Sequence, residues 1–491
     1  MTPRPVAPAA RRLTPLFLAL ALAGCASTHG LDTQVRPTDA DSLAASATLS
    51  SAGRVSALSR DWWTAFGDPQ LDALVQEALA GQPSLAAADA RVRQAVAQAG
   101  LADAARKPTV GVTAQYSGIL IPDSVAPEPL GGEYSGIVLL GLNIKYSPDF
   151  WGGQRARYEA AIGQVRAAEV EAQAARLTLA SNIVRAYVGL AQAHDALDVA
   201  SAEKARSQRL LGLGRQRVKA GIDNQMSVRN AESLVGAADQ QAAAAQQQID
   251  AAKHAIAALL GEGPDRADTI ARPKLLTAPE PGLPSVIPSE LLGHRPDVVA
   301  SRWRAEAASR GIAAAKAEFY PTVNLSALVG IAAGGLDKLF SSDALVAQGG
   351  PAISLPIFDG GRLRNNLART NADYDLAVAA YNGNLVTGLR EVADALDAAR
   401  GLDRQIAAVR RAREAAQSAF SLANTRYKAG LSTQLDVLAA QRPLLQLDQQ
   451  IAALRAQRLL AVVDLDQALG GGLELTAPTS DSTSESATAA R

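Results

Sequence analysis

The chain has 491 residues and no formal net charge, because 48 Lys and Arg residues balance 48 Asp and Glu residues. A neutral chain lacks the basic face that nucleic-acid binding requires, and a hydrophobic content of 48% is too high for a disordered chain. One Cys and four scattered His residues exclude a disulfide framework and a Cys/His metal cluster, so we expect neither a metal nor another cofactor.

The first 24 residues have the pattern of a signal peptide. Three Arg residues precede an apolar run at 13–24, about half the length that spans a bilayer. The run ends in Leu22-Ala23-Gly24-Cys25, which resembles a bacterial lipobox, where cleavage before the Cys allows its acylation. Ala26 is not the Asp that retains such lipoproteins in the inner membrane. We therefore expect Cys25 to carry acyl chains in the outer membrane; a buried Cys behind an ordinary cleavage site is the alternative.

The rest of the chain is built from two copies of one unit. Arg217-Val218-Lys219-Ala220-Gly221 returns 209 residues later as Arg426-Tyr427-Lys428-Ala429-Gly430. Further pairs keep the same order at shifts of 208 to 213 residues, which is hard to obtain by chance. These pairs are 82–83 with 295–296, 107–110 with 320–323, 152–155 with 360–363, and 260–261 with 469–470.

Each copy is expected to fold as a helix, two strands, a long helix and a second helix. Segments 153–219 and 361–429 contain no Pro and are rich in good helix formers, so each predicts a rod of about 100 Å. In the second segment, apolar residues recur at threes and fours, which is typical of a helix packed on other helices. They are Leu385, Leu389, Val392, Leu396, Ala399, Leu402, Ile406 and Val409.

The two strand pairs alternate between apolar and polar residues. One face of 109–116 reads Val, Val, Ala and Tyr, and every second residue of 134–146 reads Tyr, Gly, Val, Leu, Leu, Ile and Tyr. Segments 321–331 and 345–357 alternate likewise, with the latter placing Leu345, Ala347, Ile353, Leu355 and Ile357 on one face. Such strands suit a membrane barrel, although a soluble sheet with one face on a core has the same pattern. The signal peptide and Cys25 favour the membrane.

Four strands cannot close a barrel, and open sheet edges in lipid leave backbone groups without hydrogen bonds. A membrane barrel must therefore be shared between chains, and the long helices predict that it continues as a helical tunnel. Segments 119–133 and 333–343 are expected to connect strands outside the cell.

Three motifs complete a resemblance to a known family. They are Trp62-Trp63-Thr64-Ala65-Phe66-Gly67-Asp68-Pro69-Gln70-Leu71, Arg295-Pro296-Asp297 and Phe358-Asp359-Gly360-Gly361-Arg362. With the duplication and the lipobox, the chain after Cys25 resembles the TolC-like outer-membrane factors of tripartite efflux pumps, in their NodT-type lipoprotein branch. The resemblance implies a mainly α-helical chain with a membrane β-barrel. It also implies a homotrimer whose twelve-stranded barrel continues into an α-helical periplasmic tunnel, docked on a periplasmic adaptor (membrane fusion protein) and an inner-membrane RND-type pump.

Several motif residues have physical interpretations of their own. Pro83 and Pro296 suit the first turn of a helix, where the missing N–H costs nothing. The Gly pairs at 152–153 and 360–361 suit a change from strand to helix. The aromatic residues at 62, 63 and 66 are expected to pack in an equatorial collar rather than to bind a ligand.

The expected organisation is a signal peptide (1–24), a lipidated and equatorial segment (25–82), a first repeat (83–261), an equatorial linker (262–295), a second repeat (296–470) and a disordered tail (471–491). In the first repeat, strands at 109–118 and 134–146 precede helices at 153–219 and 224–261. In the second, strands at 321–331 and 345–357 precede helices at 361–429 and 433–469.

Two tight turns are the expected site of function. A Gly after a basic helix end predicts a turn between antiparallel helices, with Asp223 and Ser432 as candidate caps of the helices that follow. By resemblance these turns form the periplasmic tip of the tunnel and contact the adaptor. The residues that match the family's adaptor-contact motif are Ala220, Gly221, Ile222, Ala429, Gly430 and Leu431.

The family's gate lies just beyond these turns, and five residues are candidates for it: Leu435, Asp436, Arg442, Arg229 and Asp223. The hypothesis is that Asp436 or Asp223 pairs with Arg229 or Arg442 to hold the tip shut. The sequence departs from the family at Ala439, where an acidic residue is common, and Asp436 is the candidate replacement.

The predicted function is therefore a passive outer-membrane exit duct for small toxic compounds or drugs. The chain shows no nucleophile elbow, Walker-type loop or His-Glu-x-x-His helix, so an enzyme is not expected. The alternatives are a type I protein-secretion conduit of the same architecture and a lipid-anchored coiled-coil adaptor. The coiled-coil adaptor does not explain the duplicated strand pairs.

Overall fold

The computed structural model describes residues 28–45, 53–54, 59–122, 124–125, 134–274, 282–283, 288–335 and 338–472. The expected signal peptide, Cys25 and the tail beyond Gly472 lie outside the described residues. The chain divides into two compact units. Unit 1 takes the N-terminal residues to Pro37, Arg91–Ala168 and Ser301–Tyr381, and unit 2 takes Thr38–Ala90, Glu169–Ala300 and the residues from Asn382 onward.

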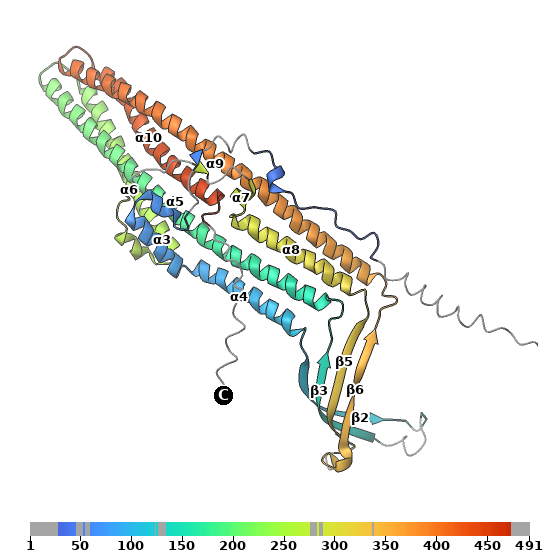
Figure 1. Cartoon of the computed structure of the whole chain (residues 1–491). Helices are drawn as coiled ribbons and strands as arrows, with labels where there is room; N and C mark the ends of the chain where they lie inside the picture. The colour runs from blue at the N-terminus through green and yellow to red at the C-terminus, as the bar shows by residue number, and fades with distance from the viewer. Residues whose placement is uncertain are drawn as a thin grey trace, which may run out of the picture. The chain divides into compact units, whose positions relative to one another are not determined.

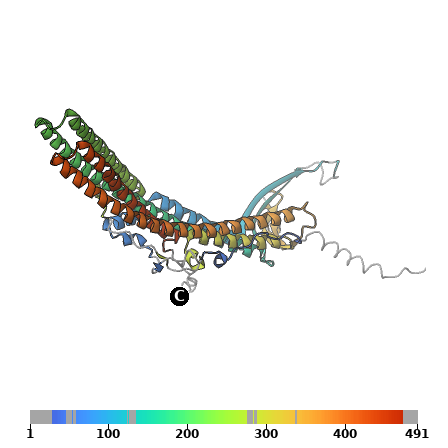
Figure 2. The ribbon, with the colours of Figure 1, turned by 90° about the horizontal axis from the view of Figure 1, so that it is seen from above.

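Two helical hairpins dominate the chain. In the first, α5 (Gly153–Lys219) is followed by α6 (Gln225–Leu260), and in the second, α9 (Arg362–Lys428) is followed by α10 (Gln434–Ala468). The two hairpins lie side by side with their turns at the same end (Figures 1 and 2). The predicted apolar seam of α9 is confirmed, because Leu385, Val392, Leu396 and Ala399 are each at most 1% exposed.

Shorter helices flank the hairpins. The predicted prolines begin α4 (Pro83–Ala104) and α8 (Pro296–Ala317). The sequence interpretation did not separate α3 (Pro69–Gly81) from the equatorial segment, nor α7 (Pro288–Leu292) from the linker. Short 3-10 helices occur at Ala40–Ser42, Trp62–Phe66, Pro264–Thr269 and Ser342–Ala344. The two-residue strands β1 (Gly53–Arg54) and β4 (Gly282–Leu283) pair in parallel. In the described chain, no helix combines the length and the apolar character needed to cross a membrane.

A four-stranded antiparallel sheet lies in unit 1. Its strands are β2 (Thr109–Leu120), β3 (Tyr134–Tyr146), β5 (Thr322–Ala333) and β6 (Leu345–Ser354), in that spatial order. The sheet is visibly curved in Figure 2. Opposite each other in β3 and β5 lie Gly141 and Gly330, and a Cβ on Gly330 would lie 2.3 Å from the Leu140 carbonyl oxygen. Only glycine fits this close backbone approach.

The register gathers the predicted apolar positions on one face. Val112 faces Leu142, which faces Val329, and these three side chains are 72%, 53% and 54% exposed. The chain itself therefore leaves an apolar sheet face uncovered. β6 ends at Ser354, three residues before the predicted end at 357, because Pro356 has no N–H to donate to a strand ladder.

Apolar clusters hold the hairpins together in unit 2. The largest joins Trp62, Trp63, Phe66 and α3 to residues of α5, α6 and α10, so the aromatic residues pack in a core as predicted. A second cluster joins Leu291 of α7 to α9 and α10, including Val392 and Leu396. In unit 1 a smaller cluster joins Phe319 to Leu363 and Leu367.

Candidate functional site

The two hairpin turns have the same backbone design. Gly221 and Gly430 adopt left-handed φ values of 70° and 74° directly after the helix ends. The Ile222 N–H donates to the Arg217 carbonyl at 3.0 Å, and the Leu431 N–H donates to the Arg426 carbonyl at 2.8 Å. These six-to-one bonds define Schellman motifs, which favour glycine because other residues are strained at positive φ. The predicted glycine turns are confirmed, and the six predicted adaptor-contact residues lie in them.

The helix caps differ from the prediction. The N-cap of α6 is Asn224, whose Oδ1 accepts from the N–H groups of Met226 and Ser227 at 3.0 and 3.4 Å. The N-cap of α10 is Thr433, in a reciprocal capping box with Asp436. The prediction of Asp223 and Ser432 was wrong by one residue in both turns, because two residues separate each glycine from the cap.

Each turn also presents an apolar pair, formed by one residue of the turn and one in the first turn of the helix that follows. Ile222 and Met226 are 61% and 70% exposed, and Leu431 and Leu435 are 71% and 72% exposed. The two pairs occupy equivalent positions in the repeat, 209 residues apart. Sequence reasoning missed Met226, although the same shift from Leu435 points to it.

A polar cluster ties the two hairpins together beside the turns. The Tyr427 hydroxyl donates to Asp223 Oδ2 at 2.8 Å, and Arg217 Nε lies 3.6 Å from the same oxygen. The Arg217 guanidinium also lies 4.4 Å from the centroid of the Tyr427 ring and donates to the Tyr427 carbonyl at 3.0 Å. Tyr427 is fully buried, in a small apolar cluster with Leu210 and Val437.

The charge states of this cluster follow from its contacts. Burial, reinforced by the hydrogen bond to Asp223, raises the pKa of Tyr427 to about 12. Burial alone would raise the pKa of Asp223, but hydrogen bonds from Ser227, Tyr427 and the Asn224 backbone hold it below 3.8. A neutral phenol therefore donates to a carboxylate at neutral pH, which is a strong, charge-assisted bond.

The other predicted gate residues have local partners. Asp436 accepts from the Thr433 backbone and hydroxyl at 2.8 and 2.9 Å, and these bonds lower its pKa. Arg229 pairs with Glu232 at 2.8 Å, and Arg442 is exposed. Within the described part of one chain, neither Asp436 nor Asp223 pairs with Arg229 or Arg442. The role of these five residues in the gate stays a prediction.

The aromatic motif near the N-terminus ends in a buried carboxylate. Asp68 is 3% exposed and caps α3 by accepting from the Gln70 N–H at 3.1 Å. Its other oxygen accepts from the Tyr187 hydroxyl at 2.7 Å and the Lys274 N–H at 2.6 Å. Asp68 thus joins α3, α5 and the linker after the 3-10 helix Pro264–Thr269, which gives the motif a structural role.

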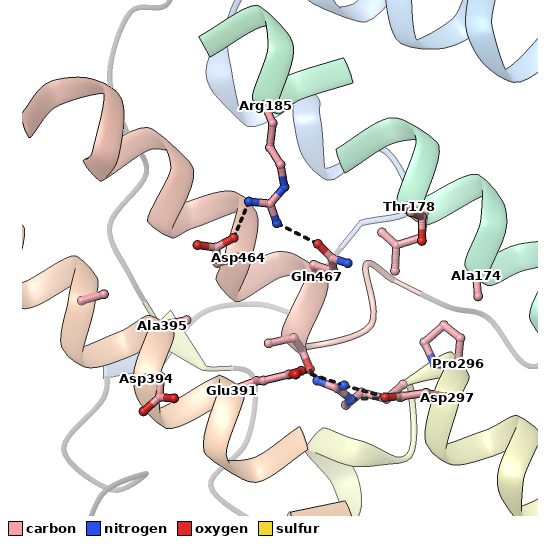
Figure 3. A pocket seen from close by; sticks show the side chains of 14 residues that line it. Ala174, Thr178, Arg185, Pro296, Asp297, Glu391, Asp394, Ala395, Asp464 and Gln467 are labelled. Carbon is pink, nitrogen blue, oxygen red and sulfur yellow. Dashed lines mark hydrogen bonds and ion pairs between the residues drawn. The ribbon is translucent and has the colours of Figure 1, made fainter. Parts of the chain in front are cut away.

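The Arg295-Pro296-Asp297 motif lines a polar hollow of about 530 Å³ in unit 2 (Figure 3). Arg295 is 6% exposed, and its Nη2 lies 2.6 Å from Asp297 and 2.9 Å from Glu391. Burial works against the charge of Arg295, but these carboxylates raise its pKa. Across the hollow, Arg185 pairs with Asp464 at 2.5 Å. The Arg295–Glu391 pair joins the start of α8 to α9, and the Arg185–Asp464 pair joins α5 to the end of α10.

The N-terminal segment of unit 1 lies along α9. The N–H groups of Gln34 and Val35 both donate to the Asp375 carboxylate at 3.0 Å, and Asn371 donates to the Leu31 carbonyl at 3.0 Å. Leu31 packs on the cluster that contains Phe319. This segment follows the predicted lipid attachment site by only a few residues.

Comparison with known proteins identifies the architecture. The sequence profile described as "Outer membrane efflux protein" matches residues 74–262 and 287–471, which confirms the tandem duplication. The fusaric acid resistance protein FusA of Burkholderia cepacia is 39% identical over 73% of this chain and 69% of its own length. The pyoverdine export outer membrane protein OpmQ of Pseudomonas aeruginosa is 33% identical over 84% of this chain and 87% of its own.

The crystal structure of the outer membrane protein VceC from Vibrio cholerae superposes with a TM-score of 0.79 at 37% identity, covering 85% of this chain and all of that one. Channels of this kind are trimers within tripartite efflux pumps and are not enzymes. The repeat, the four strands and the two hairpins thus match this architecture in both sequence and structure. The chain belongs to the outer membrane efflux protein family and is an outer-membrane channel of a TolC-like efflux system.

Proposed function

We propose that three copies of this chain form a lipid-anchored exit duct with a closed twelve-stranded barrel. The observation that carries the proposal is the sheet in unit 1. Its outer strands β2 and β6 each have one pairing partner among the described residues, and its apolar face is uncovered. Pairing of β6 with β2 of the next copy would satisfy both edges, and lipid would cover the apolar face.

Acylation of Cys25 would fix the membrane level of this duct. The His29 carbonyl accepts from Arg364, in the first turn of α9, at 3.4 Å. The four residues from Cys25 to His29 span at most about 14 Å. The acyl chains would therefore enter the membrane close to the strand-to-helix junction, where β6 leads into α9.

The two apolar pairs at the hairpin turns support docking of a periplasmic adaptor that serves an inner-membrane RND-type pump. A trimer would present six nearly equivalent turns, each with an exposed pair such as Ile222 and Met226. Exposed apolar patches with polar rims favour protein partners. The Arg217–Asp223–Tyr427 cluster is the proposed gate latch, because it links the two hairpins of one chain.

The cargo class is proposed from the relatives. Their names refer to fusaric acid resistance and to pyoverdine export. We therefore assign small toxic compounds or drugs, rather than secreted proteins, to this duct.

The native mass of the protein, extracted from outer membranes in detergent, tests the proposal. Three chain masses are expected, together with palmitate labelling that is lost in Cys25→Ser. A monomer would leave the edges of β2 and β6 without partners and would favour the coiled-coil adaptor instead. An unlabelled wild-type trimer would refute the lipid anchor alone.

A further inference from the structure

A buried polar layer separates two apolar clusters within the hairpins. The tip cluster contains Leu210 and Val437, and the main cluster contains residues of α5, α6 and α10 farther from the turns. Between them lie Glu203, Ser207 and Gln441, each at most 4% exposed. Gln441 donates to both Glu203 and Ser207, while its own Oε1 has no hydrogen-bond partner. A buried polar layer stabilises the packing less than an apolar layer of the same size would, because desolvation of its polar groups offsets their hydrogen bonds.

Ion pairs extend the layer across three helices. Arg206 of α5 lies 2.9 Å from Glu203 and 3.4 Å from Asp448 of α10, and Arg413 of α9 lies 2.6 Å from Asp448. The Arg206 and Asp448 side chains are only 12% and 10% exposed. Ion pairs with this little exposure fix an arrangement more than they stabilise it, because desolvation offsets their attraction.

Both returning helices contain a helix-weakening residue at this layer. Pro443 lies inside α10, two residues after Gln441, and has no N–H to donate to the Ala439 carbonyl. In α6, a Cβ added to Gly236 would have no neighbouring atom within 4 Å. Gly236 lies one helical turn before Asp239, which pairs with Lys204 of α5 at 2.6 Å. The repeat shift of 209 residues maps Pro443 to within two residues of Gly236. The same weak point therefore occurs in both copies.

We propose that α6 and α10 bend at Gly236 and Pro443, beside the polar layer, so that residues 225–235 and 434–442 move as levers against the rest of each hairpin. The inference rests on the proposed function, because this movement would open the latched tip. The long helices α5 and α9 contain no Pro, so the missing backbone hydrogen bond at Pro443 has no counterpart in them.

Amide hydrogen exchange on the trimer in lipid nanodiscs tests the bend directly. In the wild type, amides at 237–240 and 444–447 should exchange faster than those at 454–463, which lie beside the main cluster. The double variant Gly236→Ala with Pro443→Ala should slow exchange at both weak points by at least about tenfold. Equally slow exchange at all three segments in the wild type, or no slowing in the double variant, would overturn the proposal.

Planar-bilayer recording tests the link to gating. The double variant should open at least about tenfold less often than the wild type, with unchanged conductance once open. Gly401→Ala is the matched control, because Gly401 lies in α9 with nothing near its Cβ position and away from the polar layer; it should leave opening unchanged. Equal opening of the double variant and the control would refute the lever. A wild-type protein that never conducts would refute the proposed function, while the exchange comparison would still decide whether the helices bend.

Discussion

Tyr427→Phe is the sharpest test of the proposed latch. The change removes one hydroxyl that donates to Asp223 at 2.8 Å and keeps the aromatic ring, which contacts Arg217 and the tip cluster. A hydrogen bond to a charged group contributes about 1.5–3 kcal/mol. Asp223 keeps its bonds from Ser227 and Asn224, so we expect the lower end, about 1.5 kcal/mol per chain. That corresponds to roughly tenfold more frequent opening for each latch that acts independently.

Opening frequency in planar bilayers measures this effect, and leak of a large antibiotic into cells that produce the variant provides a second readout. Tyr381→Phe is the matched control, because Tyr381 lies in the same helix, α9, away from the turn. It should behave as the wild type. The wild type, Tyr427→Phe and Tyr381→Phe should form the same fraction of trimer, since the Tyr427 hydroxyl lies at the hairpin turns.

The latch would be refuted if Tyr427→Phe opened no more often than Tyr381→Phe. A second refutation would be equal opening of Asp223→Ala and the wild type, since this change removes the acceptor of both the Tyr427 and the Arg217 contacts. If both variants opened normally, the gate would depend on other contacts, such as the predicted pairs of Asp436 with Arg229 or Arg442.

Three further predictions concern pH and stability. Because the pKa of Asp223 is held below 3.8 and that of Tyr427 is raised from 10.0 to about 12, the latch should be fully formed between these ordinary values. Bilayer recordings should therefore show a constant opening frequency from about pH 5 to 9. The frequency should rise only as Asp223 protonates below pH 3.8 or Tyr427 ionises above pH 10. A change in opening frequency near pH 7 would contradict this. Gly430→Ala should lower the free energy of unfolding by about 1–2 kcal/mol, since only the positive φ is strained. Gly470→Ala should lower it by at least about 3 kcal/mol, because its Cβ would also lie 2.2 Å from a backbone carbonyl oxygen. Thermal unfolding monitored by circular dichroism checks this order, and equal losses for the two variants would be inconsistent with it. Tyr187→Phe should lower the free energy of unfolding by about 1.5–3 kcal/mol, because the buried Asp68 loses a hydrogen-bond donor. The opening frequency should not change. An unchanged melting temperature would show that this hydrogen bond does not stabilise the fold.

The motifs of the sequence differ in how much of their role could be predicted. The glycines of the turns were predictable because a Schellman motif depends on a few consecutive residues. The role of Asp68 was not, because its partners Tyr187 and Lys274 lie in other elements. Met226 could have been predicted, because it lies one repeat shift of 209 residues before Leu435.

The contacts of the latch could not be predicted from the sequence. The repeat places Val218 opposite Tyr427, so the sequence already marks an asymmetry between the two turns. The partner of Tyr427 is Asp223, 204 residues away, and no local pattern relates them. The hypothesis paired Asp223 with Arg229 or Arg442, which follow the two turns, whereas the packing of the hairpins brings Arg217 to Asp223 instead.

The sequence by itself determined the two copies, the helix lengths, the glycine turns and the alternation of the strands. These features depend on neighbouring residues and on periodicity, which a single chain displays directly. Only the tertiary structure decided the strand register, the closed network of the Asp223 latch and the polar layer that interrupts the hairpins. These features depend on which distant side chains meet, and that is fixed by the packing of whole helices and strands against one another.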